Sequence, residues 1–420
     1  MHFPHAIRDP IHGYIRLTEA EVRGIDTPEV QRLRGISQLG LTERVYPGAR
    51  HSRFEHALGC LEVATRIFEE LRGRIGIAGL LTPLGLPAQL ADYQALLAVV
   101  RWVGLLHDLG HAPFSHVSED LLPMGQSHEH LTVEMVSSGA VGEVLRQTGE
   151  NLYEQVIQIL HPASQDLPPP LAFAREVISG PLGADRMDYL LRDSAATGVS
   201  YGIFDLGRIL HTLQPAPSRG GVRLGILRGG VLAAEGLLWG RISMFQQVYF
   251  HRTRRILDVH LRDFLRVTLP QGTYPGEISD YLQWNDARVW EMLRTADRDS
   301  THPGHRDAQR ILRRWHHRAL PQELEANDPE KIAGWLQDWR ARILEVAPSA
   351  EPVTDLLYPP PESESGADLE VVQPGGEMIA LREVSSLVGR LRQRPLGRMY
   401  VARGVDSAPG FLPSRAGDRG

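Results

Sequence analysis

Residues 104–111, GLLHDLGH, end an apolar stretch with His107 and Asp108, and a glycine follows at position 110. Residues 88–109 have the composition of a buried helix, so the sequence places His107 and Asp108 at its carboxyl end. Burying an imidazole and a carboxylate there is costly unless a partner compensates them. A divalent cation such as Mn, Fe, Zn or Mg suits this pair of ligands. Taken alone, an adjacent His-Asp pair is more often a helix cap or an ion pair, so its context must decide.

Two other stretches supply that context. Arg53 and His56 lie three residues apart in SRFEH and therefore share one face of a predicted helix. In ADRMDYLLRD, Asp185, Tyr189 and Asp193 recur every four residues and form a polar stripe. The stripe is compatible with an interior cleft or with a solvated helix face. Spacing alone does not establish that ligands on three separate helices converge.

The chain as a whole is predicted to be mainly α-helical. IRDPIHGYIRLT, near the amino terminus, has the turn and alternation of a small β-hairpin. Periodicity and capping residues predict helices at about 28–40, 52–74, 88–109, 129–138, 151–161, 171–179, 184–196, 232–265 and 276–346, with a strand at 222–227.

Composition shifts predict three regions: a first domain at 1–270, a mostly helical lobe at 271–350, and a segment at 351–420. The last segment contains the Pro-rich linker PPPESESGAD, a hairpin-like EVVQPGGEMIAL and a flexible tail. The helical lobe also holds a group of histidines that we expect at the surface, because no carboxylate repeats with ligand spacing: His302, His305, His316 and His317.

Bulk composition narrows the functional class. The formal net charge of -6 provides no general attraction to nucleic acid or anionic lipid, so we expect neither partner. Cys60 is the single cysteine, which excludes an intrachain disulfide and a cysteine zinc cluster. The longest apolar stretch is too short to span a bilayer, and MHFPHAIRDP lacks the features of a signal peptide. We therefore expect a cytoplasmic protein.

Several ordered motifs resemble the HD-domain superfamily of metal-dependent phosphohydrolases, whose ligand pattern is H…HD…D. More narrowly, residues 8–263 resemble the deoxynucleoside triphosphate (dNTP) triphosphohydrolases, on the strength of DPIHGYIRL, IDTPEVQRLRGISQLG, YPGARHSRFEHALG, LLHDLGHAPFSH, SHEH and DRMDYLLRD. The resemblance implies an HD-domain helical core in residues 1–270. It also implies a divalent metal, with His56, His107, Asp108 and Asp185 as its ligands.

The same resemblance assigns roles to residues around the metal. His128 matches the catalytic histidine, Glu119 its carboxylate partner, and His116 is favoured as the direct proton donor. Substrate contacts are implied for Gln38, Leu39, Arg53, His111, Arg186, Tyr189, Asp193, Arg241 and Tyr249. Phe245 and Phe250 replace polar residues of the family, which leaves the base preference open.

A nucleotide effector site is implied by Asp26, Gln31 and Arg34. The family's basic residue before DPIHG is replaced by His5, so activation by nucleotides is left open. Effector sites of this kind lie between subunits, and the resemblance therefore implies a homo-oligomer, either a dimer or a tetramer.

The implied reaction cleaves a dNTP into a deoxynucleoside and inorganic triphosphate. One alternative keeps the metal site but changes the substrate to a nucleoside monophosphate, a nucleotide second messenger or a nucleic acid end. Another is a nucleotide sensor without turnover, which would be expected to lack part of the catalytic set. That set is complete in this sequence.

Overall fold

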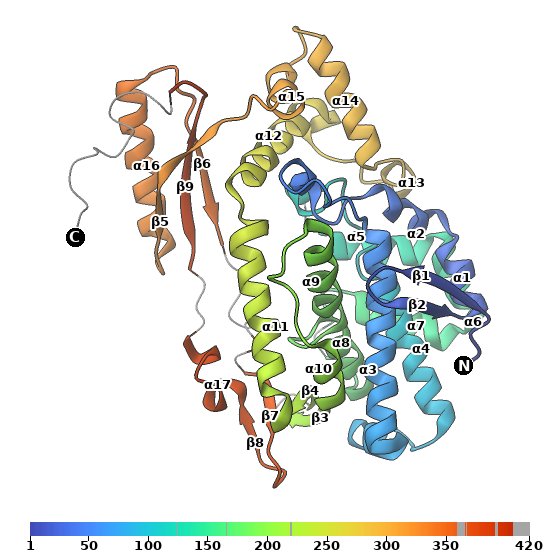
Figure 1. The fold of residues 1–420 in the computed structure, drawn as a ribbon. Coiled ribbons are helices and arrows are strands. Elements are labelled where there is room, and N and C mark those ends of the chain that lie inside the picture. Colours follow the sequence, from blue (N-terminus) through green and yellow to red (C-terminus); the bar gives the residue numbers. More distant parts are fainter. Residues whose placement is uncertain are drawn as a thin grey trace. The chain divides into compact units, whose positions relative to one another are not determined.

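The computed structural model describes residues 1–123, 125–164, 166–218, 221–358, 366, 368–390 and 394–405. The chain divides into two compact units, whose helices and strands are labelled in Figure 1. The first comprises Met1–Met244, Thr273–Val289 and Pro361–Leu391, and the second Phe245–Gly272, Trp290–Pro360 and Arg392–Gly420. Helices dominate, which confirms the predicted mainly α class. The division into domains drawn from composition stays a prediction.

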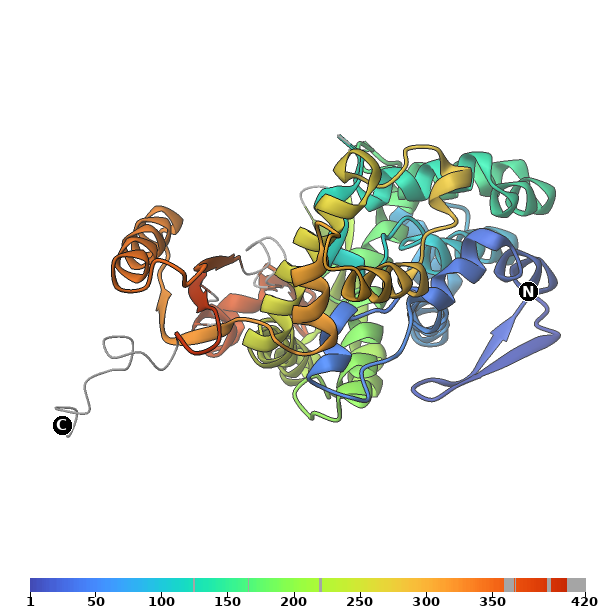
Figure 2. The same ribbon diagram turned by 90° about the horizontal axis from the view of Figure 1, so that it is seen from above.

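The predicted amino-terminal hairpin is confirmed. Strands β1 (His5–Asp9) and β2 (Gly13–Leu17) pair antiparallel, with Ile7 opposite Ile15. Oδ1 of Asp9 accepts backbone N–H bonds from Ile11 at 2.9 Å and His12 at 2.8 Å, which fixes the turn. The hairpin is the dark blue ribbon at the edge of the first unit in Figure 2. It orients His12 toward the helices.

Three helices form the centre of the first unit. Helix α3 (Arg53–Leu81) begins at Ser52, whose side chain takes part in a capping box with Glu55. Helices α4 (Leu90–Leu106) and α9 (Ala184–Thr197) both pack against α3 (Figure 1). Helix α3 is longer than predicted because it continues past Gly76, where φ of +71° introduces a kink.

A buried ion pair joins the amino-terminal elements to this centre. Arg101 of α4 is 1% exposed, and its Nε and Nη2 each donate to a carboxylate oxygen of Glu21 at 2.7 Å. The remaining donor, Nη1, reaches the Thr65 hydroxyl at 2.6 Å on α3. Burying a guanidinium is costly when its donors are unsatisfied, and these hydrogen bonds offset that cost.

The remaining helices of the first unit are α1 (Glu19–Ile25), α2 (Pro28–Arg32), α5 (His128–Ser138), α6 (Ala140–Thr148), α7 (Glu150–Leu160), α8 (Pro169–Ser179), α10 (Leu206–Thr212), α11 (Val231–Met244), α13 (Ile278–Tyr281) and α17 (Leu381–Val384). Helix α6 was not predicted. The predicted helix at 28–40 is wrong beyond Arg32, where a short 3₁₀ turn and a bridge between Ser37 and Ser52 replace it.

A small sheet completes the first unit, with strand order β3-β4-β7-β8. Its strands are β3 (Leu213–Ser218), β4 (Gly221–Leu227), β7 (Glu370–Val372) and β8 (Met378–Ala380). Strands β7 and β8 pair antiparallel, which confirms the hairpin predicted from EVVQPGGEMIAL. The linker at 359–365 and 367 and the tail at 406–420 lie outside the described residues.

The single helix predicted at 232–265 is wrong. Helix α11 ends at Met244, a π-helical turn covers Phe245–Tyr249, and α12 (Arg252–Thr268) begins afterwards. A π turn inserts one extra residue into the helical ladder, so the apolar period on either side is shifted.

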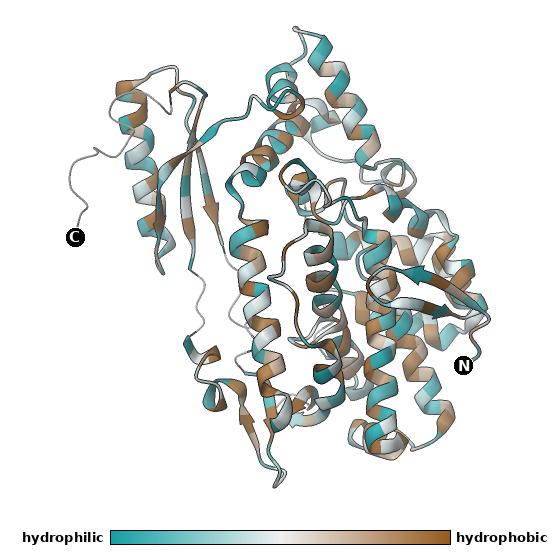
Figure 3. Ribbon diagram, viewed as in Figure 1, coloured by the Kyte–Doolittle hydropathy of each residue, from teal (hydrophilic) through white to brown (hydrophobic). Residues whose placement is uncertain are grey.

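The second unit contains α12, the part of α14 (Asp286–Arg298) from Trp290 onward, α15 (His305–Leu312), α16 (Pro329–Val346) and a three-stranded sheet. The strands β5 (Arg318–Glu325), β6 (Val353–Leu357) and β9 (Leu396–Val401) lie in the order β5-β9-β6. The all-helical expectation for 276–346 is therefore wrong at β5. Figure 3 shows both teal and brown positions along α16, whose Ile332, Leu336 and Ile343 pack into the apolar core of this unit.

The expectation of surface histidines is wrong for part of the second unit. His316 is 2% exposed and His317 is 3% exposed. His317 lies 3.2 Å from Nε2 of His260, and the opposite nitrogen of His260 lies 3.3 Å from Asp307. Elsewhere, among the residues for which the structure gives a placement, we find no helix of the length and apolar character needed to cross a membrane.

These buried histidines should make the chain sensitive to acid. Burial lowers the pKa of His317 to about 3 and that of His316 to about 4, so both are neutral in the folded chain. The unfolded chain binds protons below about pH 6.5, and stability is therefore lost as pH falls through that value. We expect His317→Gln to reduce the loss of thermal stability between pH 7.5 and pH 5, by at most about 2 kcal/mol. The exposed His211 provides a control as His211→Gln; an equal effect of both changes would contradict the prediction.

Candidate metal centre

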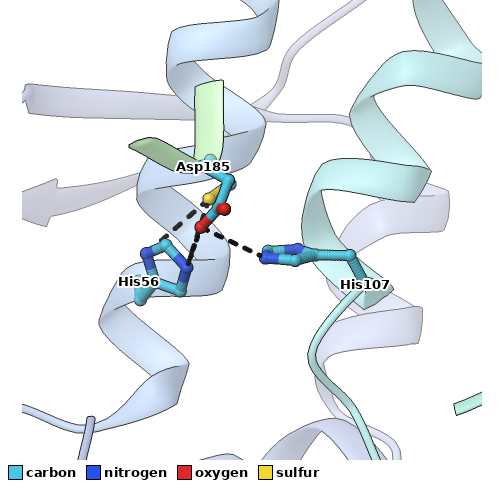
Figure 4. Close-up of side chains that lie close together, drawn as sticks. His56, His107 and Asp185 are labelled. Carbon is cyan, nitrogen blue, oxygen red and sulfur yellow. Dashed lines mark hydrogen bonds and ion pairs between the residues drawn. The ribbon is translucent and has the colours of Figure 1, made fainter. Parts of the chain in front are cut away.

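Three helices bring imidazole and carboxylate groups together. Nε2 of His56, on α3, lies 3.1 Å from Oδ1 of Asp185, at the start of α9. Nε2 of His107, directly after α4, lies 3.8 Å from the same oxygen. Figure 4 shows both rings turned toward this carboxylate. The side chains that spacing could not place therefore converge.

Asp108 joins the same group. Its Oδ2 lies 3.6 Å from Nε2 of His56, and its Oδ1 lies 3.5 Å from Nε2 of His107. Oδ2 is also paired with Arg53. Nε2 of each imidazole thus lies within 3.8 Å of an oxygen of both carboxylates, and these are ligand types that suit a divalent cation.

The hydrogen bonds behind the two imidazoles suit metal binding. Nδ1 of His56 lies 2.7 Å from a carboxylate oxygen of Asp188, and Nδ1 of His107 lies 3.0 Å from the carbonyl oxygen of Gly104. Protonating Nδ1 in each ring leaves Nε2 with a lone pair directed at the cluster. Nε2 of His107 is buried and has no hydrogen-bond partner among the described residues. A cation would satisfy that atom, so the residues present fit a metal.

The shifted pKa values of His107 and Asp108 are also consistent with a metal site. Burial alone would lower the pKa of His107, but the charge of Asp108, with smaller contributions from Cys60 and Asp185, raises it well above its usual value. Burial would raise the pKa of Asp108, yet Arg53 and His107 hold it well below its usual range. The carboxylates therefore stay ionised and are balanced by protons on the imidazoles. A divalent cation would displace those protons.

Cys60 is a neighbour that the sequence interpretation did not assign to the site. It follows His56 by one helical turn, and its buried Sγ lies 3.5 Å from Nε2 of His56. The donor atoms of Cys60, His56, His107 and Asp185 all lie within 4.8 Å of one another. The spacing of four on a predicted helix was the available signal.

Asp188 is a second residue that the sequence interpretation missed. Besides His56, it contacts His12 of the hairpin at 2.7 Å and Nη2 of Arg192 at 2.8 Å. Arg192 in turn binds Asp9 at 2.8 Å. All of these side chains are nearly fully buried. Asp188 thus orients a ligand of the candidate centre without facing the cluster itself.

The tight approach of α3 and α9 at this point requires a glycine. A Cβ built on Gly59 would lie 1.8 Å from Oδ1 of Asp188 and 2.5 Å from Nη2 of Arg192. Glycine weakens a helix interior by roughly 1 kcal/mol relative to alanine. The close packing of Asp188 explains why a glycine occupies position 59 despite this cost.

A second group of side chains lies beside the cluster. Glu119 contacts Nδ1 of His116 at 2.9 Å and also contacts Nδ1 of His128. The ring of His128 stacks on that of His111 with centroids 3.9 Å apart, and His111 lies 3.4 Å from Asp108. The residues predicted to transfer a proton are therefore adjacent to a predicted metal ligand.

Both groups open into one cavity of about 610 Å³. Its predicted members are Gln38, Arg53, His107, Asp108, His111, His116, His128, Asp185, Arg186, Tyr189 and Arg241. Its wall also includes residues that were not predicted: Val103, Glu129, Ile159, Leu160, His161, Pro162, Arg175 and Ser179. Six of these eight lie on α8 or at and just after the end of α7, where no motif marked a site.

Three residues predicted to contact the substrate are not among the described residues that line this cavity. Leu39 is buried and, like Asp193, is not among the described residues that line this cavity. Asp193 lies 2.8 Å from Nε2 of His51. Tyr249 belongs to the second unit, where its ring contacts Phe245 with centroids 5.0 Å apart. Their roles at a substrate stay predictions.

The predicted effector residues lie near the amino terminus of the first unit. Nε of Arg34 donates to Oε1 of Gln31 at 2.9 Å, and the guanidinium of Arg34 covers the ring of Phe54. Asp26 is exposed at the end of α1. Their assignment to an effector also stays a prediction.

Together the helical core and the buried histidine–carboxylate cluster define a protein built around a candidate divalent metal centre. Residues 53–176 match the family described as HD domain, and residues 204–400 match the HD associated region. The chain belongs to the HD-domain family.

The chain is also similar to several proteins of known sequence or structure. A protein of Methanocaldococcus jannaschii described as uncharacterized is 36% identical and matches 69% of this chain and 55% of its own length. The deoxynucleoside triphosphate triphosphohydrolase SAMHD1 of Homo sapiens is 29% identical, over 82% of this chain and 59% of that protein. The crystal structure of a hypothetical protein from Aquifex aeolicus is 33% identical, covers 95% of this chain and 96% of its own, and superposes with a TM-score of 0.76. The chain spans about half the length of the first curated relatives that it matches.

The role of Asp188 can be tested through metal content. We expect Asp188→Asn to weaken metal affinity roughly 10- to 100-fold, because His56 loses the carboxylate that orients it. Metal stoichiometry by mass spectrometry after dialysis measures the effect. Asp338→Asn, in the second unit, is the control, and a thermal melt of each variant separates metal loss from unfolding. Full retention of metal by a folded Asp188→Asn protein would contradict the assigned role.

Proposed function

We propose that this protein is a metal-dependent dNTP triphosphohydrolase that releases a deoxynucleoside and inorganic triphosphate. One observation carries the proposal: His107, Asp108 and Asp185 line a cavity that also contains Arg53, Arg186 and Arg241, and His56 lies behind it, 3.1 Å from Asp185. The cavity of about 610 Å³ is in the size range of small-molecule sites. A cation centre beside several guanidinium groups suits a polyphosphate better than a neutral substrate.

His56, His107, Asp108 and Asp185 would hold the divalent ion. When bound, the ion supplies a more acidic water and stabilises charge on the phosphoryl oxygens. Its identity among Mn, Fe, Zn and Mg is left to measurement. The SAMHD1 proteins, which are named as dNTP triphosphohydrolases, support the choice of substrate.

The arginines would neutralise the phosphate chain. Arg53 is held ready by Ser115, whose hydroxyl accepts from its Nε at 2.7 Å. A well-placed donor of this kind is worth about 3 kcal/mol to the transition state. Gln38, Leu39 and Tyr189 would pack against the deoxyribose and exclude a 2′-hydroxyl.

The departing 5′-oxygen needs a proton, and His116 would supply it. Glu119 contacts Nδ1 of His116, which leaves Nε2 as the atom for proton transfer. His128 shares the same carboxylate and would support the donor as the other half of a dyad. We further propose that the protein works as a homo-oligomer in the cytoplasm and that Asp26, Gln31 and Arg34 contact a nucleotide effector.

The substrate and the bond cleaved can be tested directly. We expect the protein with Mn to convert dNTPs to deoxynucleosides with release of triphosphate, detected by ion chromatography. Release of phosphate or pyrophosphate would overturn the assigned bond. Turnover of nucleoside monophosphates, a cyclic or linear second messenger, or nucleic acid ends in place of dNTPs would overturn the assigned substrate. Binding of dNTPs without products would indicate a sensor.

Two variants separate the metal ligand from the proton-transfer dyad. Asp108→Ala should abolish metal binding and activity while leaving the helical circular dichroism signal largely intact. His128→Ala should lower kcat by about 100-fold or more yet retain the metal. Full turnover by Asp108→Ala would refute the site, and metal loss in His128→Ala would refute its separate role.

A further inference from the structure

Arg175 is an arginine of the cavity wall to which the proposed reaction assigns no role. It stands on α8, and its Nη1 donates to the carbonyl oxygen of Ser164 at 2.7 Å. Its Nε and Nη2 are buried and have no hydrogen-bond partner among the described residues. These two atoms form one edge of the guanidinium, so a complete bidentate donor pair is unused.

The free-energy cost of leaving two guanidinium donors of Arg175 unpaired indicates that a ligand binds there. A buried donor without an acceptor costs about 1–3 kcal/mol, and more when the group is charged. Burial lowers the pKa of Arg175, which shows that the neighbouring groups do not repay the desolvation. The same cavity wall includes apolar residues that offer Arg175 no side-chain acceptor: Val103, Ile159, Leu160 and Pro162. An anion that enters the cavity and displaces the atoms covering this edge would satisfy both donors.

The free edge also defines the shape of that anion. Two parallel N–H donors match two oxygens of one phosphate group. Arg53 is already engaged by Asp108 and Ser115 next to the metal ligands. Arg175 reaches the cavity from another helix, so it is suited to a phosphate other than the one beside the cation.

We propose that Arg175 binds the terminal phosphate of the substrate's polyphosphate chain through Nε and Nη2 and thereby selects chain length. This rests on the proposed function, because it assumes that a polyphosphate occupies the cavity. Arg175 is then a specificity residue: a triphosphate engages it, and a monophosphate leaves the guanidinium unpaired.

Calorimetric titration of the metal-loaded, full-length chain with inorganic tripolyphosphate and pyrophosphate tests the proposal, with excess Mn in the buffer. We expect wild type to prefer tripolyphosphate, and Arg175→Gln to weaken tripolyphosphate binding about 10-fold or more while changing pyrophosphate binding little. Arg175→Lys keeps the charge without the fork and should lie between the two; it carries the test if Arg175→Gln does not fold. Arg16→Gln is the matched control for loss of one positive charge, since this side chain is 60% exposed.

Unchanged tripolyphosphate affinity in Arg175→Gln would overturn the proposal. So would an equal loss of tripolyphosphate and pyrophosphate affinity, because Arg175 would then not distinguish chain length. Failure of the proposed function gives a different result: no triphosphate is released from any dNTP, whether or not tripolyphosphate binding depends on Arg175.

Discussion

The buried carboxylate of Asp188 is the constraint around which the first unit is assembled. It binds one residue from the hairpin, one from α3 and one from its own helix α9, all away from water. An ionised carboxylate in such surroundings is stable only if every contact is made together. Forming this contact set therefore places His56 against Asp185 before any cation or substrate arrives.

The candidate site was predictable in its residues more than in its geometry. GLLHDLGH, SRFEH and ADRMDYLLRD each indicated polar groups on helices, and the structure brings the three stretches together. What periodicity cannot supply is the distance between separate helices, since that depends on packing along their whole length. Asp188 illustrates the limit: it sits three residues after Asp185, yet it faces away from the cluster and acts through His56.

The fold was predictable where local sequence decides it. The hairpin at 5–17 has its turn encoded by Asp9, and α3 has its start encoded by Ser52. Strand β5 was missed because RALPQELE contains residues that favour helices, while its extended form depends on pairing with β9 about 75 residues later, as in Glu323 opposite Arg398. The break after α11 was missed because a π turn changes the phase of the apolar pattern without a proline or a glycine to mark it.

Gly59 carries a consequence for how sequence variation in this family is interpreted. It contributes no ligand, charge or hydrogen-bonding side chain, yet the space where its side chain would be is filled by the carboxylate of Asp188. In a library that carries every substitution at every position, functional variants should be as rare at residue 59 as at the candidate metal ligands. Intolerance to substitution therefore marks positions where a side chain would clash as well as positions that take part in a reaction. A ranking of positions by intolerance would place Gly59, which has no reactive group, beside the candidate metal ligands.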